Sequence, residues 1–167
     1  MFRQERTEMD EEVRERFLHV LRESRIEHFP ELIAGFSARL VERLRVQGIA
    51  LHSIVLFGSV ARHEERRWSD VDLLVIADFS SGLKCFEESH VDLEEPSPVA
   101  VEVHPARKEW FIDDLKHQRL TAIEALEFGV VLYDVGFWEE MLLKFAELKR
   151  LGLRYEGKRT WQLAGFR

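Results

Sequence analysis

Cysteine is nearly absent from this sequence, because Cys85 is the only one in 167 residues. A disulfide within the chain is therefore excluded, which is typical of a reducing compartment and predicts a cytoplasmic location. Long hydrophobic runs are also absent, and no apolar stretch approaches the ~18–20 residues that span a bilayer. The charged segment Met1–Asp10 lacks the apolar core of a secretory signal. We therefore expect a soluble protein without a membrane partner.

Positively charged residues are fewer than negatively charged ones. The chain has 24 Lys and Arg against 31 Asp and Glu, a net charge of -7. General binding of nucleic acid is not expected, since affinity for a polyanion needs clustered positive charge. An enzyme that uses nucleotides is not excluded, because a few local cations and metal ions suffice to hold a phosphate. The 46% hydrophobic content is ordinary for a globular domain.

Hydrophobic periodicity predicts one α/β (or α+β) domain. The expected helices cover residues 9–26, 30–48, 60–67, 109–128 (in one or two pieces) and 137–151. The expected strands cover residues 49–57, 71–77, 99–103 and 130–134. Residues 78–98 are expected to form a loop, and the chain from Gly152 onward is expected to be a polar tail with isolated aromatic residues. We divide the chain into a helical extension (1–48) packed on a core (49–135), and a C-terminal helix and tail (136–167).

The first candidate site is the dipeptide Gly58-Ser59, directly after an apolar strand. A glycine lets the backbone approach a phosphate closely, and the serine adds a hydroxyl donor. A helix that begins here points free N–H groups at an anion, and Arg62 follows one turn later with a forked cation. Taken alone, a Gly-Ser pair is more typical of a structural strand-to-helix turn.

Two carboxylates follow at a fixed distance. Ten residues after Ser59 the chain reads Asp70-x-Asp72 at the start of a second apolar strand. Residues two apart in a strand point to the same side, so both acids are expected to face one site. Their mutual repulsion is relieved by a divalent cation such as Mg²⁺. A solvated strand end with two surface acids is the alternative, but the upstream Gly-Ser pair favours the metal site.

A third acid is expected for metal binding and activation of a hydroxyl, and Glu102 is the candidate. It lies in the apolar strand around Val101 and Val103, where a buried charge needs a partner or a metal. The alternative is that Glu102 faces solvent on an edge strand. His104 shares the predicted face of Glu102, and is interpreted as a surface histidine.

The full motif resembles the signature of the DNA polymerase beta-like nucleotidyltransferase superfamily. It comprises Gly58-Ser59, ten residues, Asp70-x-Asp72 and the apolar Leu73-Leu74-Val75. The small size of the chain and the sequence at the start of the second strand resemble the minimal nucleotidyltransferase branch. The closing strand Val130–Asp134 resembles it too. The match covers roughly residues 53–134.

The resemblance implies a fold and a reaction. The fold is a small mixed sheet with helices packed on one face, here preceded by two extra N-terminal helices. In the reaction, an acceptor hydroxyl attacks the α-phosphorus of a nucleoside triphosphate and pyrophosphate leaves. Asp70, Asp72 and Glu102 would hold two Mg²⁺ ions, with Mn²⁺ as an alternative, and Gly58, Ser59, Arg62 and Ser69 would bind the nucleotide.

Many members of the minimal branch resemble antitoxins that transfer AMP from ATP to a tyrosine of a HEPN-domain toxin. The resemblance therefore implies a HEPN-type toxin as partner, and it is compatible with an oligomer. Transfer to a small molecule such as an aminoglycoside is a second hypothesis, although that activity usually goes with a larger chain. A non-catalytic binding module with the same fold is a third.

Two positions depart from the usual pattern of the family. His63 stands where the family usually has glycine, in the loop that follows the Gly-Ser turn. Glu102 stands where aspartate is commoner, and its extra methylene group would alter the geometry of a metal site.

Overall fold

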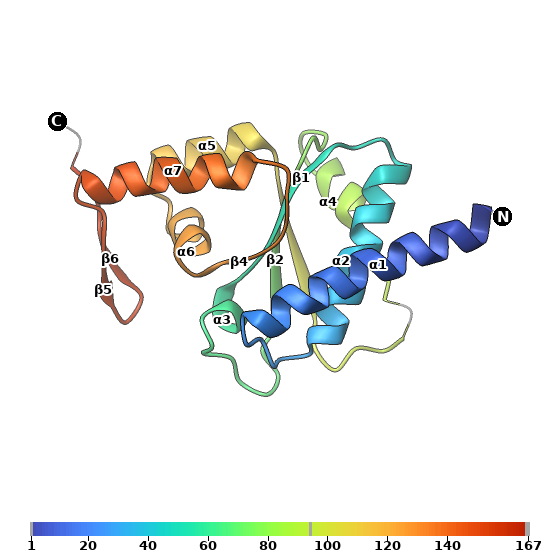
Figure 1. Ribbon diagram of the computed structural model, residues 1–167. Helices are drawn as coiled ribbons and strands as arrows, with labels where there is room; N and C mark the ends of the chain where they lie inside the picture. The colour runs from blue at the N-terminus through green and yellow to red at the C-terminus, as the bar shows by residue number, and fades with distance from the viewer. Residues whose placement is uncertain (1, 94, 166–167) are drawn as a thin grey trace.

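We describe a computed structural model of the chain, covering residues 2–93 and 95–165, with side chains from residue 8 onward (Figure 1). The helices are α1 (Phe2–Glu23), α2 (Pro30–Val46), α3 (Gly58–Ala61), α4 (Lys84–Ser89), α5 (Lys108–Lys116), α6 (Leu120–Phe128) and α7 (Phe137–Arg150). The strands are β1 (Leu51–Phe57), β2 (Val71–Ala77), β3 (Val101–Ala106), β4 (Val130–Asp134), β5 (Arg154–Gly157) and β6 (Thr160–Gln162).

The main sheet has four strands in the order β3-β2-β1-β4. Strand β1 runs antiparallel to β2 and β4, whereas β2 and β3 are parallel, so the expected small mixed sheet is confirmed. The register places Asp72 of β2 opposite Phe57 at the end of β1 and opposite Glu102 of β3. Three segments far apart in sequence therefore meet at one end of the sheet.

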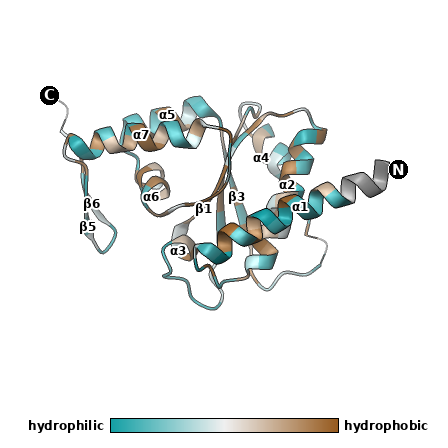
Figure 2. Ribbon diagram, viewed as in Figure 1, coloured by the Kyte–Doolittle hydropathy of each residue, from teal (hydrophilic) through white to brown (hydrophobic). Residues whose placement is uncertain are grey.

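Helices cover both faces of this sheet. Alternate residues of a strand face opposite sides, so Ile54 and Leu56 of β1 pack with α1, α2 and α4, whereas Val55 packs with α5, α6 and α7. Figure 2 shows the hydrophobic strands between the two groups of helices. Helices α5, α6 and α7 pack together on one face, as expected. The N-terminal helices α1 and α2, together with α4, cover the other face.

Two segments expected to lack regular structure contain it. Residues 78–98 include α4, which was missed because this short helix buries only one apolar side chain, Cys85. The expected polar tail contains the hairpin of β5 and β6, in which Tyr155 pairs with Trp161. Its two-residue turn has positive φ at Lys158 (50°) and Arg159 (61°), the backbone of a type I′ turn, without the Asn-Gly sequence that predicts one.

Other differences lie at the ends of elements. Helix α1 begins at Phe2 rather than at residue 9, and β3 covers Val101–Ala106 rather than 99–103. The helix expected over 60–67 is wrong in extent, because α3 ends at Ala61 and His63 has a positive φ of 56°. The expected helix over 109–128 is two helices, α5 and α6. None of the helices in the described ranges combines the length and apolarity needed to cross a membrane.

Candidate functional site

The turn after β1 lies directly against Asp72. Gly58 has a φ of +76°, and a β-carbon added to it would lie 2.5 Å from Oδ2 of Asp72. Glycine alone tolerates both this backbone conformation and this approach. The antiparallel pairing of Phe57 with Asp72 explains why the turn and the acid meet. The predicted motif therefore comes together in space, with a separation that leaves no room for a larger residue.

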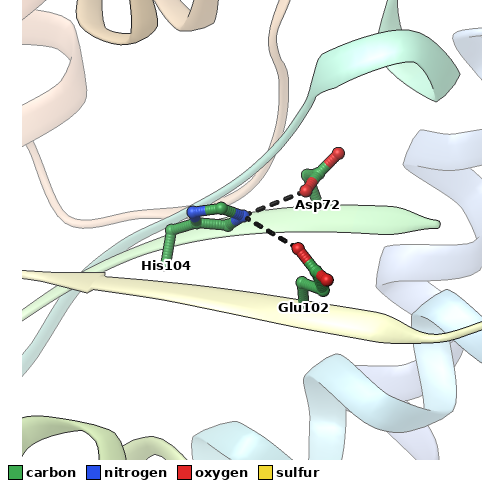
Figure 3. Close-up of side chains that lie close together, drawn as sticks. All are labelled: Asp72, Glu102 and His104. Atoms are coloured by element: carbon green, nitrogen blue, oxygen red, sulfur yellow. Dashed lines mark hydrogen bonds and ion pairs between the residues drawn. The ribbon is translucent and has the colours of Figure 1, made fainter.

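Asp72 belongs to a cluster of three side chains that could hold a metal ion. The ligand atoms of Asp72, Glu102 and His104 all lie within 4.8 Å of one another (Figure 3). The imidazole Nε2 of His104 is 2.9 Å from Oδ1 of Asp72 and 3.9 Å from Oε2 of Glu102. Glu102 and His104 share a face of β3 because they are two residues apart. The ring of Phe57 meets the His104 ring edge-on, with centroids 4.9 Å apart.

This cluster suits a divalent cation and is accessible to one. The side chain of Asp72 is 25% exposed, and those of His104 and Glu102 are 43% and 56% exposed. Carboxylate oxygens are the ligands that Mg²⁺ prefers, and an imidazole nitrogen extends the set to Mn²⁺ and other transition metals. The Glu102 side chain is exposed on an edge strand, as in the alternative interpretation of the sequence. Water can solvate its charge, so burial does not require it to have a partner.

Asp70 is not one of the three residues whose ligand atoms approach within 4.8 Å. It is exposed and lies one residue before β2, which begins at Val71. The neighbours of Asp72 in the cluster therefore come from β3, and a role of Asp70 beside them stays a prediction.

A cleft of about 320 Å³ opens beside the cluster. Part of its wall comes from the motif and part comes from α6 and from the turn of the β5–β6 hairpin. The lining residues are Phe57, Gly58, Ser59, Arg62, Asp72, Leu120, Thr121, Glu124 and Arg159. Helix α3 contains only four residues, so its dipole is negligible. The polar residues that the turn itself contributes to the lining are Ser59 and Arg62, beside the Gly58 backbone.

The other two residues predicted to bind a nucleotide are held by the protein itself. The Arg62 side chain is only 7% exposed, and its Nε donates a hydrogen bond of 3.0 Å to Oε2 of Glu64. Ser69 does not line the cleft. Its hydroxyl accepts a 2.8 Å hydrogen bond from the Arg66 backbone, and its carbonyl lies 2.8 Å from Nε2 of His28. Ser69 thus fixes the loop between the Gly-Ser turn and β2.

Sequence reasoning missed three residues at this site. His104 was considered and assigned to the surface, although its spacing of two from Glu102 already placed both on one face of a strand. Glu124 and Arg159 line the cleft without any sequence signal, because α6 and the hairpin reach it only through the tertiary fold.

Comparison with known protein families matches residues 37–133 to the nucleotidyltransferase domain. The chain belongs to this family. The resemblance identified from the Gly58–Asp72 motif is thereby confirmed, as is the expectation of a transferase enzyme. The family match contains the turn, Asp72 and the β3 residues of the cluster, but it ends before α7 and the hairpin.

A solved structure described as the crystal structure of a toxin-antitoxin with AMP-PNP is similar to the chain at 18% identity and a TM-score of 0.43. The similarity covers 67% of this chain and 85% of that one. Comparison with curated proteins gives no significant match.

Proposed function

We propose that this nucleotidyltransferase-family chain transfers AMP from ATP, with Mg²⁺, to a hydroxyl group of a partner protein. We further propose that the acceptor is a tyrosine of a HEPN-type toxin and that the chain acts as its antitoxin. The family supports the class of reaction, and the resemblance to the minimal branch supports the nucleotide and the acceptor. The absence of a membrane-spanning helix in the described residues is compatible with action in the cytoplasm.

One observation carries the proposal: the Gly58 backbone lies against Asp72, and Asp72 lies against Glu102 and His104. The turn proposed to bind phosphate and the cluster proposed to bind a cation would therefore share one carboxylate. A triphosphate bound at the turn would bring its phosphate oxygens next to the groups that suit a divalent ion.

The residues would divide the work as follows. The Gly58 backbone and the Ser59 hydroxyl would bind the β- and γ-phosphates. Asp72 and Glu102 would hold Mg²⁺ together with Asp70, one residue before β2. A Mg²⁺ ion held there would neutralise phosphate charge and lower the pKa of the acceptor hydroxyl. The acceptor oxygen forms a bond to the α-phosphorus, the bond from that phosphorus to the β-phosphate oxygen breaks, and pyrophosphate leaves with the bonding electron pair. The exposed carboxylate of Glu102 takes the hydroxyl proton and exchanges it with water.

Nucleotide binding tests this proposal without knowledge of the acceptor. ATP, GTP, CTP and UTP are titrated by calorimetry with and without Mg²⁺ into the wild-type chain, Asp72→Asn and Asp78→Asn. Asp78 is a matched control because it is an exposed acid immediately after the other end of β2. We expect Mg²⁺-dependent ATP binding that Asp72→Asn weakens at least tenfold and Asp78→Asn leaves unchanged. A folded wild-type chain that binds no triphosphate would overturn the proposal.

Label transfer then tests the reaction and the acceptor. The chain is incubated with ATP labelled at the α- or the γ-phosphate and with a small helical protein encoded beside it that carries an Arg-x-x-x-x-His motif. AMP transfer predicts label on a tyrosine of that protein from α-labelled ATP only. If an Asp70→Asn/Asp72→Asn variant still neutralises the toxin, the chain is a binding module, and if label appears only on an aminoglycoside, the acceptor is a small molecule.

A further inference from the structure

The β5–β6 hairpin lies outside the family match and is firmly anchored to the rest of the fold. The rings of Tyr155 and Trp161 pair across the hairpin with centroids 5.1 Å apart. Tyr155 also packs on Phe128 of α6 at 5.3 Å, and Trp161 packs on Phe145 of α7 at 6.3 Å. Aromatic pairs of this kind hold one orientation, so the hairpin has a fixed place on the core.

The turn of the hairpin is fixed as well. The Arg159 backbone N–H donates a 3.1 Å hydrogen bond to the hydroxyl of Tyr155. Beyond β6, the side chain of the buried Gln118 donates to the carbonyl of Ala164 at 3.0 Å and accepts from its N–H at 2.7 Å. Arg159 is therefore held at the wall of the cleft before any ligand binds.

An acid beneath the turn attracts Arg159 toward the cleft. Glu124 of α6 has a side chain only 9% exposed, and its Oε1 is buried without a hydrogen-bond partner. Its Oε2 lies 3.6 Å from Arg62 and 3.8 Å from Arg159, which is ion-pair distance but too long for a hydrogen bond. A carboxylate this buried needs compensating charge, which the two guanidinium groups supply.

The two arginines differ in what they can offer to a ligand. Arg62 is 7% exposed and its Nε already donates to Glu64, so its guanidinium is largely shielded from a ligand in the cleft. Arg159 is 57% exposed, and among the described residues its side chain makes one contact, the long one to Glu124. These two are the cations among the residues that line the cleft, which also carries the acids Asp72 and Glu124. A polyanion entering the cleft therefore finds its accessible fork of donors on Arg159.

We propose that Arg159 is a phosphate-binding residue of the nucleotide site, supplied by the C-terminal hairpin and positioned by Glu124. This inference rests on the proposed function, because it assumes that a nucleoside triphosphate occupies the cleft. The guanidinium group forms a two-pronged, charge-assisted contact with a phosphate, which the weak contact to Glu124 leaves it free to make. The hairpin is then part of the nucleotide-binding site and not only a structural element near the C-terminus.

The test compares two cations of the same turn. Arg159→Ala and Lys158→Ala each remove one positive charge at a residue with positive φ, but Lys158 does not line the cleft. Binding of ATP and of AMP with Mg²⁺ is measured by calorimetry for both variants, and amide hydrogen exchange in β5 and β6 checks that the hairpin stays docked. We expect Arg159→Ala to weaken ATP binding about tenfold and AMP binding less than twofold, with Lys158→Ala unchanged.

The outcomes separate this inference from the proposed function. If the wild-type chain binds no triphosphate, both the proposed function and this inference are overturned. If the wild-type chain binds ATP and Arg159→Ala binds it equally well, the inference alone is overturned. Should Arg159→Ala undock the hairpin, Arg159→Lys serves instead, since it keeps the charge and loses the fork. ATP affinity must then fall between wild type and background, and an unchanged affinity rejects the inference.

Discussion

Gly58 and Asp72 are fitted to each other: a β-carbon on Gly58 would lie 2.5 Å from Oδ2 of Asp72 and 3.3 Å from its Cγ. The obstacle is a carboxylate beside Glu102 and His104, not a flexible surface side chain. Any residue larger than glycine must therefore displace the group on which the candidate cation site depends. This relationship links the shape of a turn directly to the chemistry of the site.

Replacing Gly58 with alanine should abolish nucleotide binding. The change strains a backbone with φ +76° and pushes Asp72 aside. Gly48→Ala is the matched control, because Gly48 has φ +70° and nothing lies within 4 Å of the added carbon. Both variants should lose about 1–2 kcal/mol of unfolding free energy from the strained φ. Only Gly58→Ala should lose Mg²⁺-dependent ATP binding in calorimetry, and equal binding losses in the two variants would contradict the fitted contact.

His63 adopts the backbone conformation that glycine prefers. Its φ is 56°, in the loop where the resemblance indicates that the family usually has glycine. His63→Gly should therefore raise the free energy of unfolding by up to about 1 kcal/mol, because relief of the left-handed strain exceeds the entropy that glycine adds to the unfolded chain. Arg66→Gly, at an exposed loop residue without positive φ, should lower it by about 0.5–1 kcal/mol. Urea denaturation measures both, and a destabilised His63→Gly would contradict the strain.

Glu88 should make stability depend on acid pH. The hydroxyl and backbone N–H of Ser80 donate to its two carboxylate oxygens at 2.5 and 2.8 Å, and the hydroxyl hydrogen bond is the main cause that lowers the pKa of Glu88. A lowered pKa in the folded state stabilises the fold above the ordinary glutamate pKa. That stabilisation disappears as the pH falls through the lowered value.

Glu88→Gln tests this pH dependence. The variant should have a lower thermal midpoint than wild type at neutral pH, and the difference should shrink as the pH falls through the lowered pKa of Glu88 and the wild-type carboxyl becomes protonated. Glu87→Gln is the control, since Glu87 is the exposed neighbour in the same helix. A Glu88→Gln deficit that stays constant down to acid pH would show that packing, not charge, is lost.

Two strands and one turn could be predicted from the local sequence alone. Strands β2 and β4 lie where continuous apolar runs placed them, over Val71–Ala77 and Val130–Asp134. A continuous apolar run is itself the strand signal, so it can be recognised without knowing which helices cover the strand. The turn at Gly58 was predicted for the same reason, because a glycine directly after a buried strand carries its own signal.

The composition of the cleft was not predictable in this way. Asp72 was predicted from its spacing after the Gly-Ser turn, but His104 joins it and Glu102 only because β3 lies beside β2. Glu124 and Arg159 line the cleft because α6 and a hairpin turn without Asn-Gly fold against it. Their distance from the motif along the sequence gives no sign of this contact. Such residues become visible only when the packing of the elements is known.

Gln118 should be the residue that holds the C-terminal segment in place. It is 5% exposed, and its side-chain amide makes both a donor and an acceptor contact with the backbone of Ala164. Gln118→Ala leaves two buried backbone groups of Ala164 without partners, which should cost about 1–3 kcal/mol of unfolding free energy. Because the segment beyond β6 would then detach, amide hydrogen exchange should accelerate in the hairpin more than in β1 and β2.

Gln162→Ala is the matched control for this prediction. Gln162 lies in the same hairpin and its side chain is exposed, accepting a 2.6 Å hydrogen bond from Arg154. Loss of that exposed contact should change stability by no more than about 0.5 kcal/mol. If Gln118 anchors the segment that carries Arg159, Gln118→Ala should also weaken ATP binding, whereas Gln162→Ala should not. Equal exchange rates in the two variants would show that the aromatic contacts of Tyr155 and Trp161 hold the hairpin without help from Gln118.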